Sequence, residues 1–198
     1  MEFNVTDDSQ NQRFYNIVWP ERAHVLRCAL FLTHKTSDAE DLAQETLLKA
    51  WRALDSFGLR KHGVRPWLLT ILKNTWRDSL RRQNRRGVEV PLDDLIETPT
   101  VPETQDSPLP SGPSSADIDA LLQGFSDQHV VDALRCLRHE FRWVLLLVDV
   151  SSLSYDQAAT LLEVPVGTVR SRLFRGREAL RNILMRREKT TPPNNKLR

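Results

Sequence analysis

Arginine is concentrated in one short segment near the C-terminus. The segment VPVGTVRSRLFRGR, residues 164–177, holds four arginines in eight residues, although the 198-residue chain has a formal net charge of only +2. A guanidinium group stays charged and presents a planar fork of donors that fits phosphate oxygens and the edge of guanine. A charged run on a helix is often only a solvated face, but such a face usually has acids one turn away. No acid lies between Glu163 and Glu178, so the segment favours contact with DNA.

Two helices are predicted to position these arginines. Ser154 to Gln157 fits a capping box that opens a short helix, SYDQAATLL. Glu163 and Val164 then make a turn, and a second helix begins at Pro165 or Val166 and runs to about Arg187. Ala159 and Val169 suit the close crossing of a helix-turn-helix. On the second helix we expect the apolar residues Val169, Leu173 and Leu180 to face inward. The opposite face is then lined by Thr168, Ser171, Arg172 and Arg175. Its flank is formed by Arg170, Phe174 and Arg177. This arrangement predicts a recognition helix for the major groove.

A second basic helix is predicted over RPWLLTILKNTWRDSLRRQNRR, residues 65–86. Its period places Leu68, Ile71, Leu72 and Thr75 inward, with two outward stripes: Lys73, Arg77 and Arg81, and Asn74, Asp78, Arg82 and Arg85. Cations beside aromatic rings and an amide are typical of proteins that bind single-stranded nucleic acid. For Trp67 and Trp76 the alternative of core packing is the commoner one.

An amphipathic helix is predicted over DAEDLAQETLLKAWRALDSF, residues 38–57. One face collects Ala39, Ala43, Leu47, Ala50, Trp51 and Leu54, and the opposite face carries Asp41, Gln44, Glu45 and Arg52. Ser37 or Asp38 can cap its start. A preceding helix over roughly residues 12–32 supplies more apolar side chains, with a break expected at Pro20.

Charge divides the chain into blocks. Residues 57–90 and the chain from Pro165 onward are basic, whereas residues 91–132 contain no Lys or Arg. Six prolines between residues 91 and 113 predict an extended, flexible tether, and a loop this long inside one compact domain is uncommon. The sequence therefore predicts an all-α protein of two small helical domains, residues 1–90 and 129–190, joined by a linker over residues 91–128 and followed by a disordered tail, residues 191–198.

Other classes of protein lack support in the sequence. There is no secretory signal and no apolar run of membrane-spanning length, so a cytoplasmic protein is expected. Cys28 and Cys136 show no metal-ligand spacing, the five histidines are scattered, and no nucleophile–base pair or phosphate-binding glycine loop is present. We therefore expect no enzyme activity, no cofactor and no metal.

The three motifs, in this order and across a tether, closely resemble the extracytoplasmic-function (group IV) sigma factors of bacterial RNA polymerase, from about Asn11 to Arg187. The resemblance implies a sigma region 2 domain, a sigma region 4 domain and an alternative sigma factor that initiates transcription at specific promoters, often in stress responses. It implies contact with the β′ clamp helices of the polymerase core through Asp38, Asp41, Gln44, Glu45 and Lys49, and a contact with the β flap. It implies −10 binding by Lys73, Asn74, Arg77, Arg81 and Arg82, with Asn74 at the base pocket and residues 58–65 as its rim. It implies −35 binding by Tyr155, Asp156, Thr168, Arg170, Ser171, Arg172, Phe174 and Arg175. An anti-sigma partner is also expected.

Two features depart from the family pattern. Glu163 occupies a position where many helix-turn-helix proteins have glycine, which predicts a less tightly wound turn, and the basic loop GLRKHGVR, residues 58–65, lacks an aromatic residue. A stand-alone helix-turn-helix regulator is the main alternative. It explains the C-terminal half equally well, but it assigns no function to the polar face around Asp41 or to the helix that contains Asn74.

Overall fold

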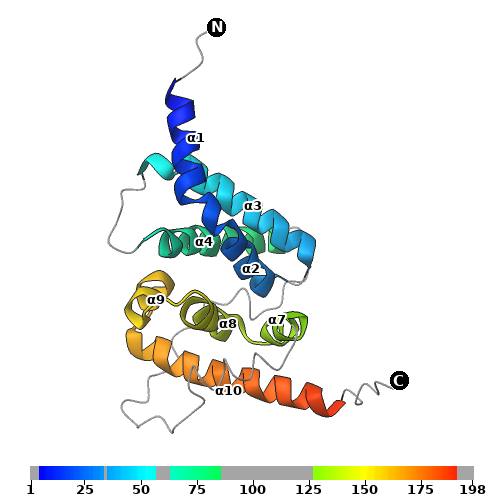
Figure 1. The fold of residues 1–198 in the computed structure, drawn as a ribbon. Helices are drawn as coiled ribbons and strands as arrows, with labels where there is room; N and C mark the ends of the chain where they lie inside the picture. The colour runs from blue at the N-terminus through cyan, green and yellow to red at the C-terminus, as the bar shows by residue number, and fades with distance from the viewer. Residues whose placement is uncertain (1–4, 34, 57–62, 86–126, 191–198) are drawn as a thin grey trace, which may run out of the picture. The chain divides into compact units, whose positions relative to one another are not determined.

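The computed structural model describes residues 5–33, 35–56, 63–85 and 127–190, and every regular element in these ranges is a helix (Figure 1). The described residues fall into two compact units, one ending at Arg85 and one beginning at Asp127. The all-α class and the two-unit organisation are therefore confirmed. Residues 91–126 of the predicted linker and the whole predicted tail lie outside the described residues, while residues 127 and 128 begin α7 (Asp127–Arg135). The domain limits stay a prediction.

The described part of the N-terminal unit contains four α-helices and two short 3₁₀ turns. These are α1 (Val5–Ile17), η1 (Trp19–Glu21), α2 (Arg22–Leu32), α3 (Thr36–Arg52), η2 (Leu54–Ser56) and α4 (Val64–Arg85). The break expected at Pro20 is present, because the chain changes from α1 through η1 to α2 there. Helix α3 begins at Thr36, so Ser37 and Asp38 lie in its first turn and neither is the cap.

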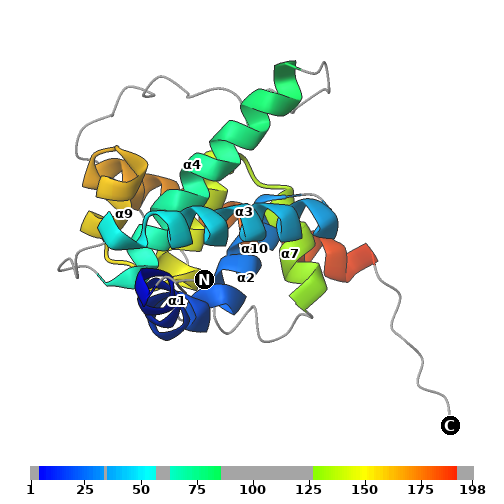
Figure 2. The same cartoon turned by 90° about the horizontal axis from the view of Figure 1, so that it is seen from above.

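Helix α3 is the centre of this unit, because it packs against both α2 and α4, which it crosses in Figure 2. Its predicted apolar face is confirmed at Ala39, Ala43 and Ala50, which are buried. The buried face also includes Leu42 and Thr46. The hydroxyl of Thr46, which is fully buried, donates to the carbonyl of Leu42 at 2.7 Å, and this hydrogen bond satisfies it inside the core.

The C-terminal unit is built on one long helix. Its elements are α7 (Asp127–Arg135), α8 (His139–Leu145), the π-helical turn η3 (Leu146–Val150), α9 (Tyr155–Leu162) and α10 (Val166–Thr190). Helix α10 runs across α7, α8 and α9 (Figure 1). At Gly176, a Cβ atom would lie 3.3 Å from the side chains of both Leu145 and Phe141, so only glycine fits this close approach to α8 without displacement.

The pair α9 and α10 forms the predicted helix-turn-helix. The capping box is present, since the backbone N–H of Gln157 donates to Ser154 Oγ at 3.2 Å and that of Ser154 donates to Gln157 Oε1 at 2.9 Å. Glu163 adopts the left-handed conformation, with φ 60° and ψ 41°. The N–H of Val164 donates to the carbonyl of Ala159 at 3.1 Å, the six-to-one bond of a Schellman turn. Glu163 thus takes the conformation that glycine usually supplies, and the expectation of a looser turn is not met.

No helix in the described ranges is both long enough and apolar enough to span a bilayer.

Candidate nucleic-acid interface

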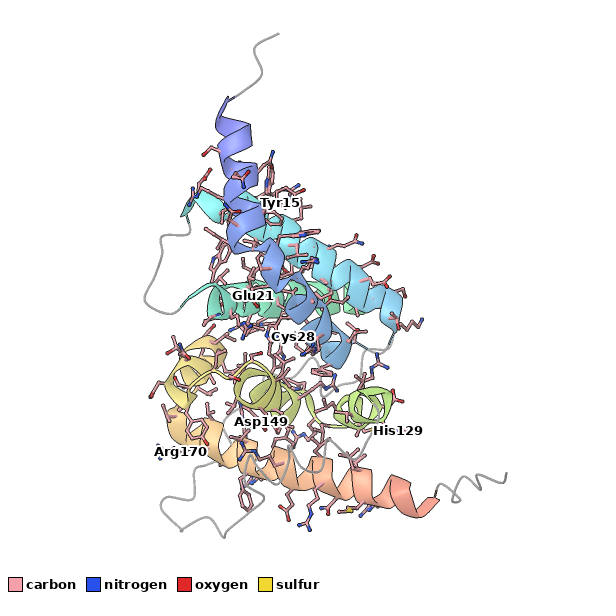
Figure 3. All side chains as sticks on the ribbon, in the orientation of Figure 1. Tyr15, Glu21, Cys28, His129, Asp149 and Arg170 are labelled. Carbon is pink, nitrogen blue, oxygen red and sulfur yellow. The ribbon has the colours of Figure 1, made fainter. Side chains whose placement is uncertain are left out.

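The first half of α10 presents a cationic outer face. Arg170 and Arg175 are exposed, and Ser171, Arg172 and Phe174 are partly exposed between them. Val169, Leu173 and Leu180 are buried beneath this face at 2% exposure or less, as the periodicity predicts. The buried side therefore fixes the rotation of the helix, and this rotation turns Arg170 (labelled in Figure 3) and Arg175 outward.

Tyr155 joins this face from α9. The guanidinium carbon of Arg170 lies 5.9 Å from the centre of the Tyr155 ring, within the range of a cation–π contact. Tyr155 is 37% exposed and its neighbour Asp156 is exposed. The structure therefore brings together Arg170 and Tyr155, two side chains from different helices that the sequence assigned to one surface.

Arg172 is held more firmly than its neighbours. Its Nη2 lies 3.5 Å from a carboxylate oxygen of Glu140 on α8, and the two side chains are 20% and 10% exposed. Such a pair leaves part of the guanidinium open to a further acceptor, because the fork has five donors.

Two residues of this segment depart from their expected exposure. Thr168 is only 8% exposed, so it does not line the outer face, because its position one residue before Val169 places it at the edge of the packed stripe. Arg177 is 9% exposed and does not flank that face. It forms a bidentate ion pair with Asp149 of η3 within the unit. The DNA contact assigned to Thr168 stays a prediction, and the expectation that its side chain faces outward is wrong.

The second basic surface lies on α4. Asn74, Arg81 and Arg82 are exposed and Arg77 is partly exposed, as expected for side chains that contact DNA. Lys73 is only 6% exposed, because it lies four residues after Leu69 and three before Trp76, on the stripe of buried side chains. Its outward orientation was wrongly predicted. Trp76 is 4% exposed and belongs to the core, whereas Trp67 is partly exposed.

The polar face of α3 is open at its N-terminal half. Asp38, Asp41 and Gln44 are exposed, and Glu45 and Lys49 are partly exposed. Leu48 lies among them and is 46% exposed. Sequence reasoning missed this leucine, although its position four residues after Gln44 places it on the polar face.

Ion pairs connect the polar face of α3 to the basic helix α4. Arg82 Nη2 lies 3.0 Å and 3.2 Å from the two carboxylate oxygens of Glu45. Lys49 Nζ lies 3.3 Å from Glu45 and 3.4 Å from Asp78 on α4. Residues assigned to the polymerase and a residue assigned to DNA thus share one network on the protein surface.

Within the described ranges, no three or more His, Cys, Asp or Glu side chains are grouped so that they could hold a metal ion.

The comparisons with known families match both units. The sigma-70 region 2 model matches residues 20–86, which span α2, α3 and α4. The sigma-70 region 4 model matches residues 128–180, which end within α10.

Curated relatives match most of the chain. The ECF RNA polymerase sigma-E factor of Escherichia coli (strain K12) is 31% identical over 172 residues, which cover 87% of this chain and 87% of the relative. The sigma-E factor of Salmonella typhimurium (strain LT2) has the same identity and coverage. The ECF RNA polymerase sigma factor SigE of Mycolicibacterium smegmatis is 32% identical over 84% of this chain, and the matched part spans 60% of the relative's length.

Solved structures are also similar. The sigma factor RpoE, solved in complex with the anti-sigma factor NepR from Bartonella quintana, matches 91% of this chain and 98% of its own with a TM-score of 0.64 and 27% identity. CnrH, solved with the cytosolic domain of CnrY, matches 87% of this chain and 88% of its own with a TM-score of 0.50 and 22% identity, a likeness of fold.

Proposed function

Because this chain belongs to the extracytoplasmic-function sigma factors of the sigma-70 family, alternative sigma factors that direct RNA polymerase to promoters, we propose that its two units divide promoter recognition. The N-terminal unit binds the polymerase core and the −10 element, and the C-terminal unit reads the −35 element. The observation that carries this proposal is the pair of cationic helices, α4 and α10, each exposed in a different unit.

The −35 element is read in the major groove by α10. Arg170 and Arg175 are exposed on the first half of the helix, which is the part that a helix-turn-helix places against base edges. An arginine can form two hydrogen bonds with guanine, while Ser171 and Tyr155 are suited to phosphate contacts. Arg170 already contacts the ring of Tyr155, so its side chain has fewer orientations in the free protein. It therefore loses less conformational entropy when it binds DNA.

The −10 element is captured by α4. Its exposed Asn74 has an amide that can both donate to and accept from the edge of an unpaired base. Arg77, Arg81 and Arg82 lie on the following two turns, where they neutralise the phosphates of the same strand.

The polymerase core binds the polar face of α3. The β′ clamp helices contact Asp38, Asp41 and Gln44, and Leu48 supplies a small apolar anchor among these polar groups. The β flap is the proposed contact of the C-terminal unit. Two weak readers on one polymerase act at a high effective concentration, so neither needs high affinity alone.

An anti-sigma protein is the proposed negative regulator, since the similar sigma factor from Bartonella quintana was solved with such a partner. We place the chain in the cytoplasm with the polymerase, and assign to it binding and positioning without catalysis of its own.

The test is reconstitution with core polymerase. The tagged chain should retain the core in a pull-down, and the mixture should give a run-off transcript only from promoters that the chain selects. Retention of DNA without retention of the core would instead identify a stand-alone regulator.

A further inference from the structure

An exposed group of aromatic rings lies where α1 meets α2, and none of its residues has been assigned a role above. Tyr15 is 58% exposed and Trp19 is 41% exposed, which is unusual for side chains of this size. The ring centres of Phe14, Tyr15 and Trp19 lie 5.7 to 6.2 Å apart. Arg22 completes the group, with its guanidinium carbon 4.9 Å from the centre of the Trp19 ring. These four residues are called the aromatic patch below.

The charges around the aromatic patch favour an anionic partner. No Asp or Glu occurs between Ser9 and Pro20. Among the described side chains next to the patch, Asp55 pairs with Arg13 at 3.2 Å and Glu21 pairs with Arg65 at 2.8 Å. Arg22 donates a hydrogen bond to the carbonyl of Trp19 at 3.0 Å, and its side chain stays exposed. An acidic protein surface would satisfy the charge alone, whereas flat rings beside a cation also suit unstacked bases.

The position of the aromatic patch relates it to the basic helix α4. The ion pair between Glu21 and Arg65 joins the end of η1 to the first turn of α4 (Glu21 and Tyr15 are labelled in Figure 3). Arg65 precedes Asn74 by nine residues, which is about 14 Å along a helix axis. Asn74 therefore lies about two and a half turns along α4 from the residue that is joined to η1.

We propose that the aromatic patch is a stacking platform for unpaired DNA bases adjacent to the base captured at Asn74. This inference rests on the proposed function, because it takes the unpaired strand from the −10 role of α4. Tyr15 and Trp19 provide the flat surfaces, and Arg22 neutralises a phosphate or stacks on a base.

The experiment measures binding of the holoenzyme to a promoter fork whose non-template strand is unpaired from the −10 element onward. Trp19→Leu and Tyr15→Leu keep apolar area but remove the flat ring. Each should weaken binding about 5-fold or more, as expected for one lost base stack. Trp19→Phe should restore most of the affinity. Met185→Ala changes an exposed apolar residue of the other unit, 38% exposed, and should have no effect.

A second measurement isolates stacking from charge. Abasic sites are placed one at a time along the unpaired strand, which removes a base but keeps its phosphate. When the abasic site lies at one or two particular positions of the unpaired strand, the wild-type chain and Trp19→Leu should bind the fork with equal affinity. If Trp19→Leu matches Met185→Ala on every fork, or if its defect persists at every abasic position, the platform is refuted. Weaker binding to the core without DNA would show a protein contact instead.

The two proposals fail differently. If the wild-type holoenzyme forms no promoter-specific complex, the proposed function is wrong and the platform falls with it. If that complex forms and depends on Asn74 but not on Tyr15 or Trp19, only the platform is wrong.

Discussion

Arg177 of α10 and Asp149 of η3 form a bidentate ion pair, with Nε to Oδ2 at 3.1 Å and Nη2 to Oδ1 at 2.6 Å. The side chains are 11% and 7% exposed, so the pair is almost fully removed from water (Asp149 is labelled in Figure 3). It joins α10 to the turn that precedes the helix-turn-helix. Of the four arginines in residues 170–177, this one therefore supports the fold, Arg172 pairs with Glu140, and Arg170 and Arg175 are exposed on the proposed DNA-reading face.

Removing one partner of this pair should destabilise the C-terminal unit. Asp149→Ala leaves a buried guanidinium without its counter-charge, a change that costs about 3 to 5 kcal/mol. The free energy of unfolding in urea, followed by circular dichroism, measures the loss. The double variant Asp149→Leu/Arg177→Met should recover much of that stability and still bind −35 DNA. If the double variant folds but loses DNA binding, Arg177 has a direct role at the interface.

Arg175 tests base reading by α10. Arg175→Ala should weaken −35 binding by about 1 to 3 kcal/mol and relax the preference at one base pair. Arg181→Ala is the matched control, since Arg181 is exposed on the same helix beyond the recognition half. Competition binding against single-base variants of the −35 element measures both effects. An equal loss on every variant would identify Arg175 as a phosphate contact.

The polar face of α3 should separate polymerase binding from DNA binding. Asp41→Arg reverses an exposed charge and should weaken association with the core, and Leu48→Ala should weaken it by about 1 kcal/mol through lost apolar contact. Fluorescence anisotropy with labelled core measures the affinity. A charge reversal at an exposed residue of the same unit with no assigned contact, Arg27→Glu on α2, should leave it unchanged. Unaltered core binding in Asp41→Arg would place the clamp elsewhere.

His24 predicts a pH dependence of the N-terminal unit. Burial and the neighbouring cations Arg65 and Arg27 lower the pKa of His24 below 6.5, although Glu21 opposes this shift. The unfolded chain therefore binds the proton more tightly, so stability is greatest above pH 6.5 and falls as the pH drops toward the folded-state pKa. Urea unfolding between pH 5 and pH 8 measures this, and His24→Gln should flatten the profile. An unchanged slope in that variant would assign the dependence to other groups.

Backbone strain at Ser152 offers a stabilising substitution. Ser152 is exposed with φ 55°, a conformation that costs a residue with a Cβ atom about 1 to 2 kcal/mol. Ser152→Gly should therefore raise the melting temperature by a few degrees, net of the greater entropy of unfolded glycine. Ser154→Gly is the contrasting variant, because it removes the cap of α9 and should lower the melting temperature. Ser152→Val should also lower it.

Local patterns predicted most of the helices. The capping box at Ser154 and the break at Pro20 depend on neighbours in the sequence, and both are present. Lys73 and Thr168 are buried because each lies at the edge of the helix face that packs against another element. A helical period locates this edge only to within about one residue, so their burial could not be predicted from the sequence. The pairing of Arg177 with Asp149, 28 residues away, depends on tertiary packing that no local pattern encodes.

The candidate surfaces were partly predictable for the same reason. Asn74, Arg170 and Arg175 are exposed as expected, because strong apolar stripes beside them fix the rotation of α4 and α10. The aromatic patch was not predicted. Phe14 and Trp19 are typical core residues by type, and only the fold shows that the turn at Pro20 leaves Trp19 facing water.

The ion pairs of Glu45 with Arg82 and of Lys49 with Asp78 connect the proposed polymerase surface on α3 to the proposed DNA surface on α4. A single substitution therefore does not separate the effects of the two surfaces. Replacing Glu45 deprives Arg82 of its partner, so a variant made to disturb one interface also alters the charge presented at the other. Genetic screens that score transcription alone will therefore assign such positions to both surfaces at once. Compensating double replacements, in which both partners of a pair are exchanged, offer the cleaner way to tell a defect in assembly from one in promoter capture.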